Sequence, residues 1–194
     1  PYAREEWPLA RALLGETVRG ELAHIERADC TRAIVRLSAA PVRDGLGERI
    51  AAVALVEDVT EQRRAEIDRD RVWELSADSL VVACFDTRFK RVNSAFIRAI
   101  GWTKEELLAI HYLDIVHPDD LPATIDRMRR FAQGESCVEC VVRVRAKNGE
   151  YRHFSWTATP VPSDQLIYAV GRDVTAQKRA EARQALLVRA SGLL

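Results

Sequence analysis

The feature that most constrains this chain is a long internal repeat. Residues 58–66 read Asp-Val-Thr-Glu-Gln-Arg-Arg-Ala-Glu, and residues 173–181 read Asp-Val-Thr-Ala-Gln-Lys-Arg-Ala-Glu. The similarity extends backward, because residues 39–42 (Ala-Ala-Pro-Val) resemble residues 158–161 (Ala-Thr-Pro-Val). Such self-similarity predicts two successive copies of one structural module. Only 40 residues precede Pro41, so the first copy corresponds to the C-terminal half of the second.

The composition is that of a globular protein and gives no bulk attraction to polyanions. Of 194 residues, 47% are hydrophobic, and 29 basic residues balance 29 acidic ones. A neutral chain has no net electrostatic drive toward nucleic acid or an anionic membrane, so neither is an expected partner of this segment. No apolar stretch reaches the roughly 20 residues of a membrane span. Four cysteines are too few for a secreted disulfide scaffold, and we expect a cytoplasmic location.

The second copy predicts an α+β module. Two short β-rich runs, 81–86 and 89–93, flank a two-residue turn and are expected to form a hairpin. Capping signals at Asn93 or Ser94 and at Thr103 predict short helices, and a longer helix runs from Pro118 to Gly134 with Leu121, Ile125, Met128 and Phe131 inward. Three longer strands then follow, the first two joined by an Asn-Gly turn.

The first copy repeats only the later part of this plan. A helix over 5–14 precedes strands at 18–25, 32–42 and 49–59, with a turn at 44–47. A three-stranded sheet of this size leaves a strand edge and an apolar face uncovered, so we expect it to be marginally stable alone.

Four motifs in register carry a family resemblance. They are Gly101-Trp102-Thr103-Lys104-Glu105-Glu106-Leu107, Ile115-Val116-His117-Pro118-Asp119-Asp120, residues 143–152 (Arg-Val-Arg-Ala-Lys-Asn-Gly-Glu-Tyr-Arg), and Asp173-Val174-Thr175. In this order the sequence resembles the PAS sensory-domain family with its C-terminal PAC motif. The resemblance implies a five-stranded antiparallel sheet with helices on one face. It divides the chain into a truncated PAS/PAC copy (1–60), a helical linker (61–78), a complete PAS/PAC domain (79–175) and an outgoing helix (176–194).

The resemblance also implies a function. It suggests a sensory and regulatory module of a multidomain bacterial signalling protein, such as a sensor histidine kinase, with an effector domain downstream in the parent chain. The alternatives are a ligand-free dimerisation and relay scaffold, or the regulatory part of a cyclic-di-GMP enzyme or a phosphatase. The sequence shows no catalytic constellation, so this fragment is not expected to be an enzyme.

The family's small-molecule pocket lies between the sheet and the helices. Here its lining is expected from Phe85, Phe96, Ile100, Ile115, Met128, Phe131, Trp156 and Tyr168, which as apolar residues equally suit a plain core. No cofactor is predicted. The long helix lacks the histidine of haem-binding relatives, and His111-Tyr112-Leu113-Asp114 lacks the cysteine of flavin-binding ones.

Other residues have expected structural roles. Cys137 and Cys140 have metal-ligand spacing, but positions i and i+3 of a regular strand face opposite ways, so no metal site is expected. Glu106 and Lys147 match a salt bridge of flavin-binding relatives. His117 is expected to cap the long helix. The basic cluster formed by Arg143, Arg145, Lys147 and Arg152 is interpreted as a solvated sheet face rather than a nucleic-acid site.

Two positions are candidates for signal relay. Asp58 with Thr60, and Asp173 with Thr175, each stand where a strand gives way to a charged helix, and threonine is a competent N-cap. In the last segment Ala180, Leu187 and Leu194 recur at intervals of seven, which predicts a homodimer formed through helices.

Overall fold

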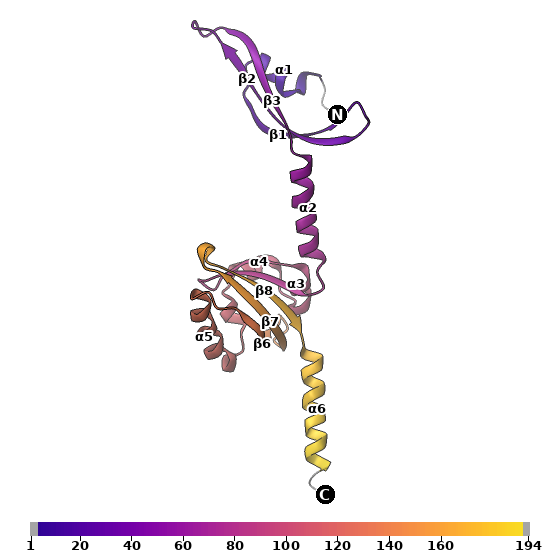
Figure 1. Cartoon of the computed structure of the whole chain (residues 1–194), viewed down its shortest axis with the longest axis vertical. Coiled ribbons are helices and arrows are strands. Elements are labelled where there is room, and N and C mark those ends of the chain that lie inside the picture. Colours follow the sequence, from indigo (N-terminus) through magenta and orange to yellow (C-terminus); the bar gives the residue numbers. More distant parts are fainter. Residues whose placement is uncertain (1–3, 192–194) are drawn as a thin grey trace. The chain divides into compact units, whose positions relative to one another are not determined.

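The computed structural model describes residues 4–191 of the chain. They divide into two compact units at the boundary between Asp70 and Arg71, and each unit is described by itself (Figure 1). Within the described residues, no helix has the length and apolar character needed to cross a bilayer.

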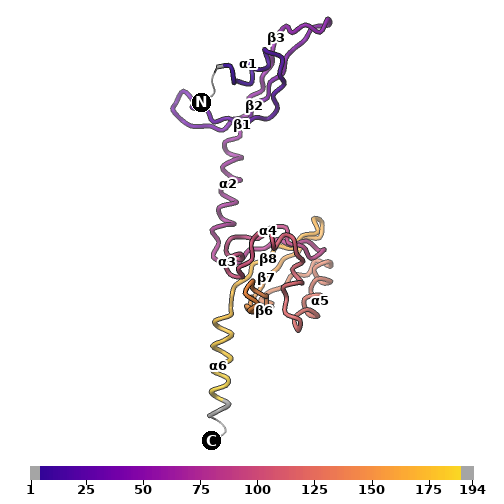
Figure 2. Tube along the Cα trace, turned by 180° about the vertical axis from the view of Figure 1, so that it is seen from behind, coloured from indigo at the N-terminus to yellow at the C-terminus, as the bar shows by residue number. Residues whose placement is uncertain are grey.

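The first unit is a three-stranded antiparallel sheet with one short helix. A 3₁₀ turn at Arg4–Glu6 leads into α1 (Pro8–Leu13). The strands β1 (Val18–Glu26), β2 (Arg32–Arg43) and β3 (Arg49–Asp58) follow in the spatial order β1-β2-β3, and Figure 2 traces their antiparallel path.

Strand β3 leaves apolar side chains in solvent. Within the described residues it pairs with β2 alone, and Val53 and Leu55 are 58% and 67% exposed. The buried cluster of this unit is small and consists of Ala23, Val35 and Leu37. The uncovered edge and apolar face expected for the truncated copy are therefore present.

The second unit has a five-stranded antiparallel sheet in the order β5-β4-β8-β7-β6, which confirms the expected α+β architecture. Helix α2 (Thr60–Leu75) precedes it. Its elements are β4 (Ser79–Cys84), β5 (Phe89–Val92), α3 (Ser94–Ile100), α4 (Lys104–Ala109), α5 (Leu121–Ala132), β6 (Cys137–Arg145), β7 (Tyr151–Val161), β8 (Leu166–Asp173) and α6 (Thr175–Ser191). Short 3₁₀ turns lie at Tyr112–Ile115, Pro118–Asp120 and Pro162–Asp164.

Side-chain caps set the helix starts that the sequence predicts. Asn93 is fully buried, and its Oδ1 accepts hydrogen bonds from the amides of Phe96 and Leu80 at 3.0 and 2.9 Å. Thr103 and Glu106 form a capping box at the start of α4. His117 Nδ1 accepts from the amide of Asp119 at 3.2 Å, so this histidine caps the 3₁₀ turn that leads into α5.

The core of the second unit lies between the helices and one face of the sheet. Phe96, Ile100 and Leu107 from the helices pack against Phe154 from β7, and all four are at most 1% exposed. The opposite face of the sheet exposes Val170, which is 44% exposed. The helices thus cover one face only.

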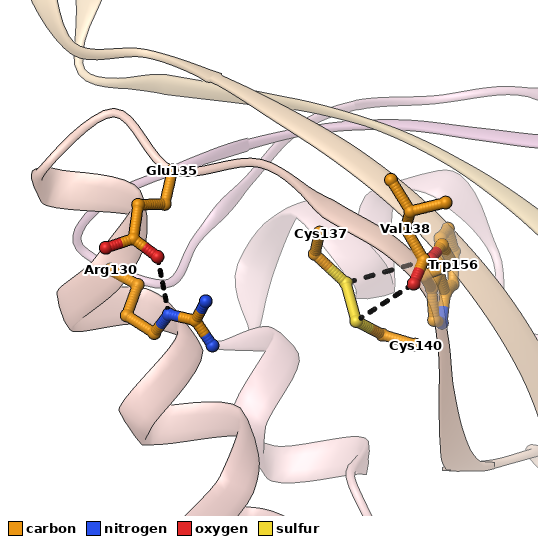
Figure 3. The surroundings of a disulfide bond; sticks show 6 residues. All are labelled: Arg130, Glu135, Cys137, Val138, Cys140 and Trp156. Atoms are coloured by element: carbon orange, nitrogen blue, oxygen red, sulfur yellow. Dashed lines mark hydrogen bonds and ion pairs between the residues drawn. A yellow bond between two sulfur atoms is a disulfide. The ribbon is translucent and has the colours of Figure 1, made fainter.

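One local feature of β6 contradicts the sequence prediction. Cys137 pairs with Ala158 and Cys140 with Trp156, so three steps along β6 match two along β7. This β-bulge contains Glu139 with φ of 53°. The extra residue brings both cysteines to one side, where they form a disulfide with Cα atoms 6.3 Å apart (Figure 3). The prediction that the two sulfurs diverge is therefore wrong.

Candidate functional site

A cavity of about 120 Å³ lies between the inner face of the sheet and helices α3 and α5 of the second unit. Its walls are almost entirely apolar and draw on all five strands. Five of the expected lining residues are found there: Phe96, Ile115, Met128, Phe131 and Trp156. The Trp156 ring stacks on Phe154 at 5.4 Å and meets the edge of Phe96 at 5.7 Å, which gives this wall a rigid aromatic surface.

The structure does not place the other three expected residues in the lining. Ile100 is 1% exposed within the main core, and Phe85 packs against the small cluster that includes Phe131. Tyr168 is 46% exposed. Its neighbours Ile167 and Ala169 line the cavity, and because successive strand side chains alternate, Tyr168 faces the other way.

The lining also has a polar part, which the sequence did not predict. Thr124 and Arg127 of α5 join Met128 and Phe131 at spacing i, i+3, i+4, i+7, which is one helix face. The hydrophobic pattern alone selected Ile125 instead, but Ile125 is 40% exposed. Arg127 could have been found from the sequence if polar residues had been counted on the same helix face as Met128 and Phe131.

Burial perturbs two of the lining groups. Desolvation raises the pKa of Tyr112 to about 12 and lowers the pKa of the Arg127 guanidinium. Tyr112 is therefore a protonated donor at neutral pH, and Arg127 remains a cation because its ordinary pKa is so high.

The disulfide belongs to the edge of this site. Cys137 is 6% exposed and lines the cavity, and its Sγ lies 3.8 Å from the carbonyl oxygen of Trp156. Cys140 is half-buried beside it, with its Sγ 3.8 Å from the carbonyl oxygen of Val138 (Figure 3). Among the described residues, no group of three His, Cys, Asp or Glu side chains is placed to hold a metal ion.

The second candidate site is the joint between β8 and α6. Asp173 Oδ1 accepts from the amide of Thr175 at 2.9 Å, and Asp173 Oδ2 accepts from Arg152 at 3.0 Å. Thr175 Oγ1 accepts from the amide of His153 at 2.9 Å. This joint therefore ties the first turn of α6 to both β7 and β8.

The joint between β3 and α2 repeats this arrangement in the first unit. Asp58 Oδ1 accepts from the amide of Thr60 at 3.0 Å, Arg27 pairs with the other carboxylate oxygen, and Thr60 Oγ1 accepts from the amide of Ile34 at 2.9 Å. The Thr60 hydroxyl also donates to Asp58 Oδ1 at 2.6 Å, and this bond, together with those from the Thr60 amide and Arg27, lowers the pKa of Asp58 to about 2. In both joints the aspartate accepts a hydrogen bond from the first amide of the helix, whereas the threonine hydroxyl accepts one from an amide of the neighbouring strand. The expectation that the threonines cap the helices is corrected accordingly.

The side chains of the basic cluster form ion pairs and hydrogen bonds with other residues of the second unit. Lys147 Nζ forms an ion pair with Glu106, and this contact holds the pKa of Glu106 below its ordinary value. Arg143 donates to Asp119 and Asp120, both 3₁₀-turn residues. Arg145 donates to the carbonyl of Asp114 at 3.0 Å. These contacts tie the sheet to the helical segment.

Comparison with known proteins identifies the family. A family described as "PAS fold" matches residues 89–171, and one described as "PAS domain" matches residues 8–61. The chain is therefore a tandem of PAS domains. PAS domains are sensory and regulatory modules, and this is the class to which both units belong. No curated protein sequence matches the chain.

Solved structures share the fold of the second unit. A domain of a sensory box sensor histidine kinase/response regulator from Geobacter sulfurreducens is 23% identical with a TM-score of 0.51, covering 59% of this chain and 99% of that one. The PAS domain of an HTR-like protein from Haloarcula marismortui is 18% identical with a TM-score of 0.50, covering 58% and 96%. A PAS domain from Colwellia psychrerythraea is 16% identical with a TM-score of 0.51, covering 58% and 98%.

Proposed function

We propose that the second unit senses a small apolar molecule in its cavity and passes the occupancy of that cavity to helix α6 through the Asp173–Thr175 joint. The output domain of the parent protein, in this proposal a histidine kinase or a similar signalling effector, would respond to α6. The fragment itself performs no chemistry in this scheme.

The observation that carries the proposal is that the same two strands form the cavity wall and the joint. Trp156 of β7 and Ala169 of β8 line the cavity. Further along these strands, His153 of β7 and Asp173 of β8 bond to Thr175. A ligand that displaces the Trp156 wall therefore acts on strands that hold the first turn of α6 by side-chain hydrogen bonds.

Hydrogen–deuterium exchange of the full chain tests the proposal, with toluene as a neutral probe of the cavity. Toluene is expected to change the exchange rate of the first-turn amides of α6, residues 175–178. The substitution Thr175→Val keeps the shape of the side chain but removes the hydroxyl that accepts from His153, so it should abolish this response while toluene still binds.

The repeat supplies a matched control. Thr60→Val removes the same hydrogen bond from the other joint, and the toluene response at residues 175–178 should persist in this variant. If toluene binds but exchange in α6 does not change, the relay is wrong. If an untreated chain purified from its host carries no small molecule and no small apolar probe binds, toluene included, the sensory role of the cavity is wrong.

A second candidate function is dimerisation through α6. Leu186, Leu187 and Val188 are each at least 60% exposed on this helix. Leu194, the next position of the heptad pattern, lies outside the described residues. Light scattering of the full chain over a concentration series tests this proposal, because Leu187→Glu should shift a dimer toward the monomer. A wild-type chain that stays monomeric at high concentration would contradict it.

A further inference from the structure

Arg127 is the charged residue in the lining of the cavity, and a plain hydrophobic core does not explain its position. It lines the cavity from α5 and is more than half-buried. Within residues 4–191 its guanidinium has no hydrogen bond or salt bridge in the structure. A partly desolvated cation without a counter-ion is unfavourable, so its presence beside an apolar cavity requires a reason.

The acidic groups near Arg127 do not neutralise it. Asp120 attracts the Arg127 guanidinium electrostatically. However, both carboxylate oxygens of Asp120 already accept hydrogen bonds from the Arg143 side chain, Oδ1 at 2.8 Å and Oδ2 at 3.1 Å. Asp126 attracts it more weakly, and Arg130 repels it. The Thr124 hydroxyl donates to the carbonyl of Asp120 at 2.8 Å. The guanidinium therefore retains free donors.

We propose that the cavity binds a small apolar monocarboxylate whose carboxylate pairs with Arg127 and whose hydrocarbon body fills the apolar space. A guanidinium presents paired N–H donors that match a carboxylate in a bidentate arrangement. Tyr112, which also lines the cavity, supplies a phenol proton that suits an acceptor rather than a cationic ligand. The inference rests on the proposed sensory function and names its ligand class.

The volume of the cavity limits the hydrocarbon body. An apolar cavity of about 150 Å³ accommodates benzene. The cavity here is smaller, about 120 Å³, so a single ring is the upper limit for the hydrocarbon body and a short branched chain is the alternative. The Trp156 and Phe96 rings on its wall suit an aromatic or compact aliphatic body. Benzoate and 3-methylbutanoate are the simplest probes of this class.

Calorimetric titration of the full chain with matched ligands tests the proposal. Benzoate should bind more tightly than toluene, its neutral counterpart, and more tightly than benzylammonium, its cationic counterpart. Arg127→Gln should weaken benzoate binding by roughly 10- to 100-fold, the range expected for losing a charge-assisted hydrogen bond. Toluene binding should change little in the same variant.

Arg129→Gln is the control, because Arg129 is an exposed arginine on the same helix and does not line the cavity. Equal binding of benzoate and toluene by the wild-type chain, or no effect of Arg127→Gln, would overturn the carboxylate assignment and leave the sensory function standing. Binding of none of the apolar probes would refute both. The wild-type comparison of the three ligands decides the question even if Arg127→Gln fails to fold.

Discussion

Replacing Gly171 by alanine should destabilise the second unit and push the Trp156 ring into the cavity. Gly171 lies opposite Trp156 in the pairing of β7 with β8. A Cβ atom added at Gly171 would lie 2.5 Å from Cζ3 of Trp156 and 2.7 Å from both Cε3 and Cη2. The tryptophan ring therefore occupies the space that any larger residue would need.

The size of the effect follows from the contacts of that ring. Non-bonded carbon atoms prefer about 3.5–4.0 Å, so the ring must move by about 1 Å or more. It is held by Phe154 and Phe96 at centroid distances of 5.4 and 5.7 Å, which leaves the cavity as the available direction. Overpacking of this kind costs about 1–3 kcal/mol. The gain from restricting the unfolded chain, about 0.4–1 kcal/mol, offsets part of it.

Thermal and urea unfolding of the full chain measure the net loss, which should be about 1–2 kcal/mol. Gly45→Ala, in the first unit, controls for the substitution itself, because no atom lies within 4 Å of a Cβ added there, and it should leave the unfolding of the second unit unchanged. The double variant Gly171→Ala with Trp156→Phe should lose less stability than the two single variants together, since the smaller ring makes room for the methyl group.

The same substitution should change ligand binding. Because the displaced ring fills part of the cavity, Gly171→Ala should weaken toluene binding. An unfolding free energy equal to that of the wild type, together with additive effects in the double variant, would show that the ring is not confined as described.

Three further predictions follow from buried or paired groups. Asn93→Ala should lower the unfolding free energy by about 2–4 kcal/mol, because it leaves buried backbone amides without acceptors; urea titration measures this. The pKa of Asp58 is lowered to about 2, so its stabilising contribution is complete above its ordinary pKa and is lost as the pH falls toward 2. Stability between pH 5 and 2 should therefore fall less steeply in Asp58→Asn, and parallel pH profiles would contradict this. Because Cys137 and Cys140 are bonded, only two of the four cysteines should react with iodoacetamide before reduction, and four afterwards; mass spectrometry counts them.

Much of the fold was predictable because its signals are local. The strand boundaries of the second unit, the capping box at Thr103 and the cap at Asn93 depend on residues within a few positions of one another. The repeat added information that a single copy lacks, because the two Asp-x-Thr sequences indicate two equivalent strand-to-helix joints. Their geometry in the structure is the same in both units.

The site was only partly predictable because its composition depends on which faces meet. Apolar character identified Phe96 and Trp156. Tyr168 is also an aromatic residue, but it faces outward, and only the register of β8 shows this. Arg127 was missed because a charged residue on a helix is expected to face solvent.

The sequence by itself determined the tandem organisation, the order of strands and helices, and the positions of the two joints, since these depend on short-range patterns and on the repeat. Only the tertiary structure decided that β6 bulges at Glu139, that Cys137 and Cys140 meet, and that Arg127 borders an apolar cavity. A bulge is defined by the register of a partner strand, and a cavity by side chains that are distant in sequence. Neither leaves a periodic signal in the chain that forms it.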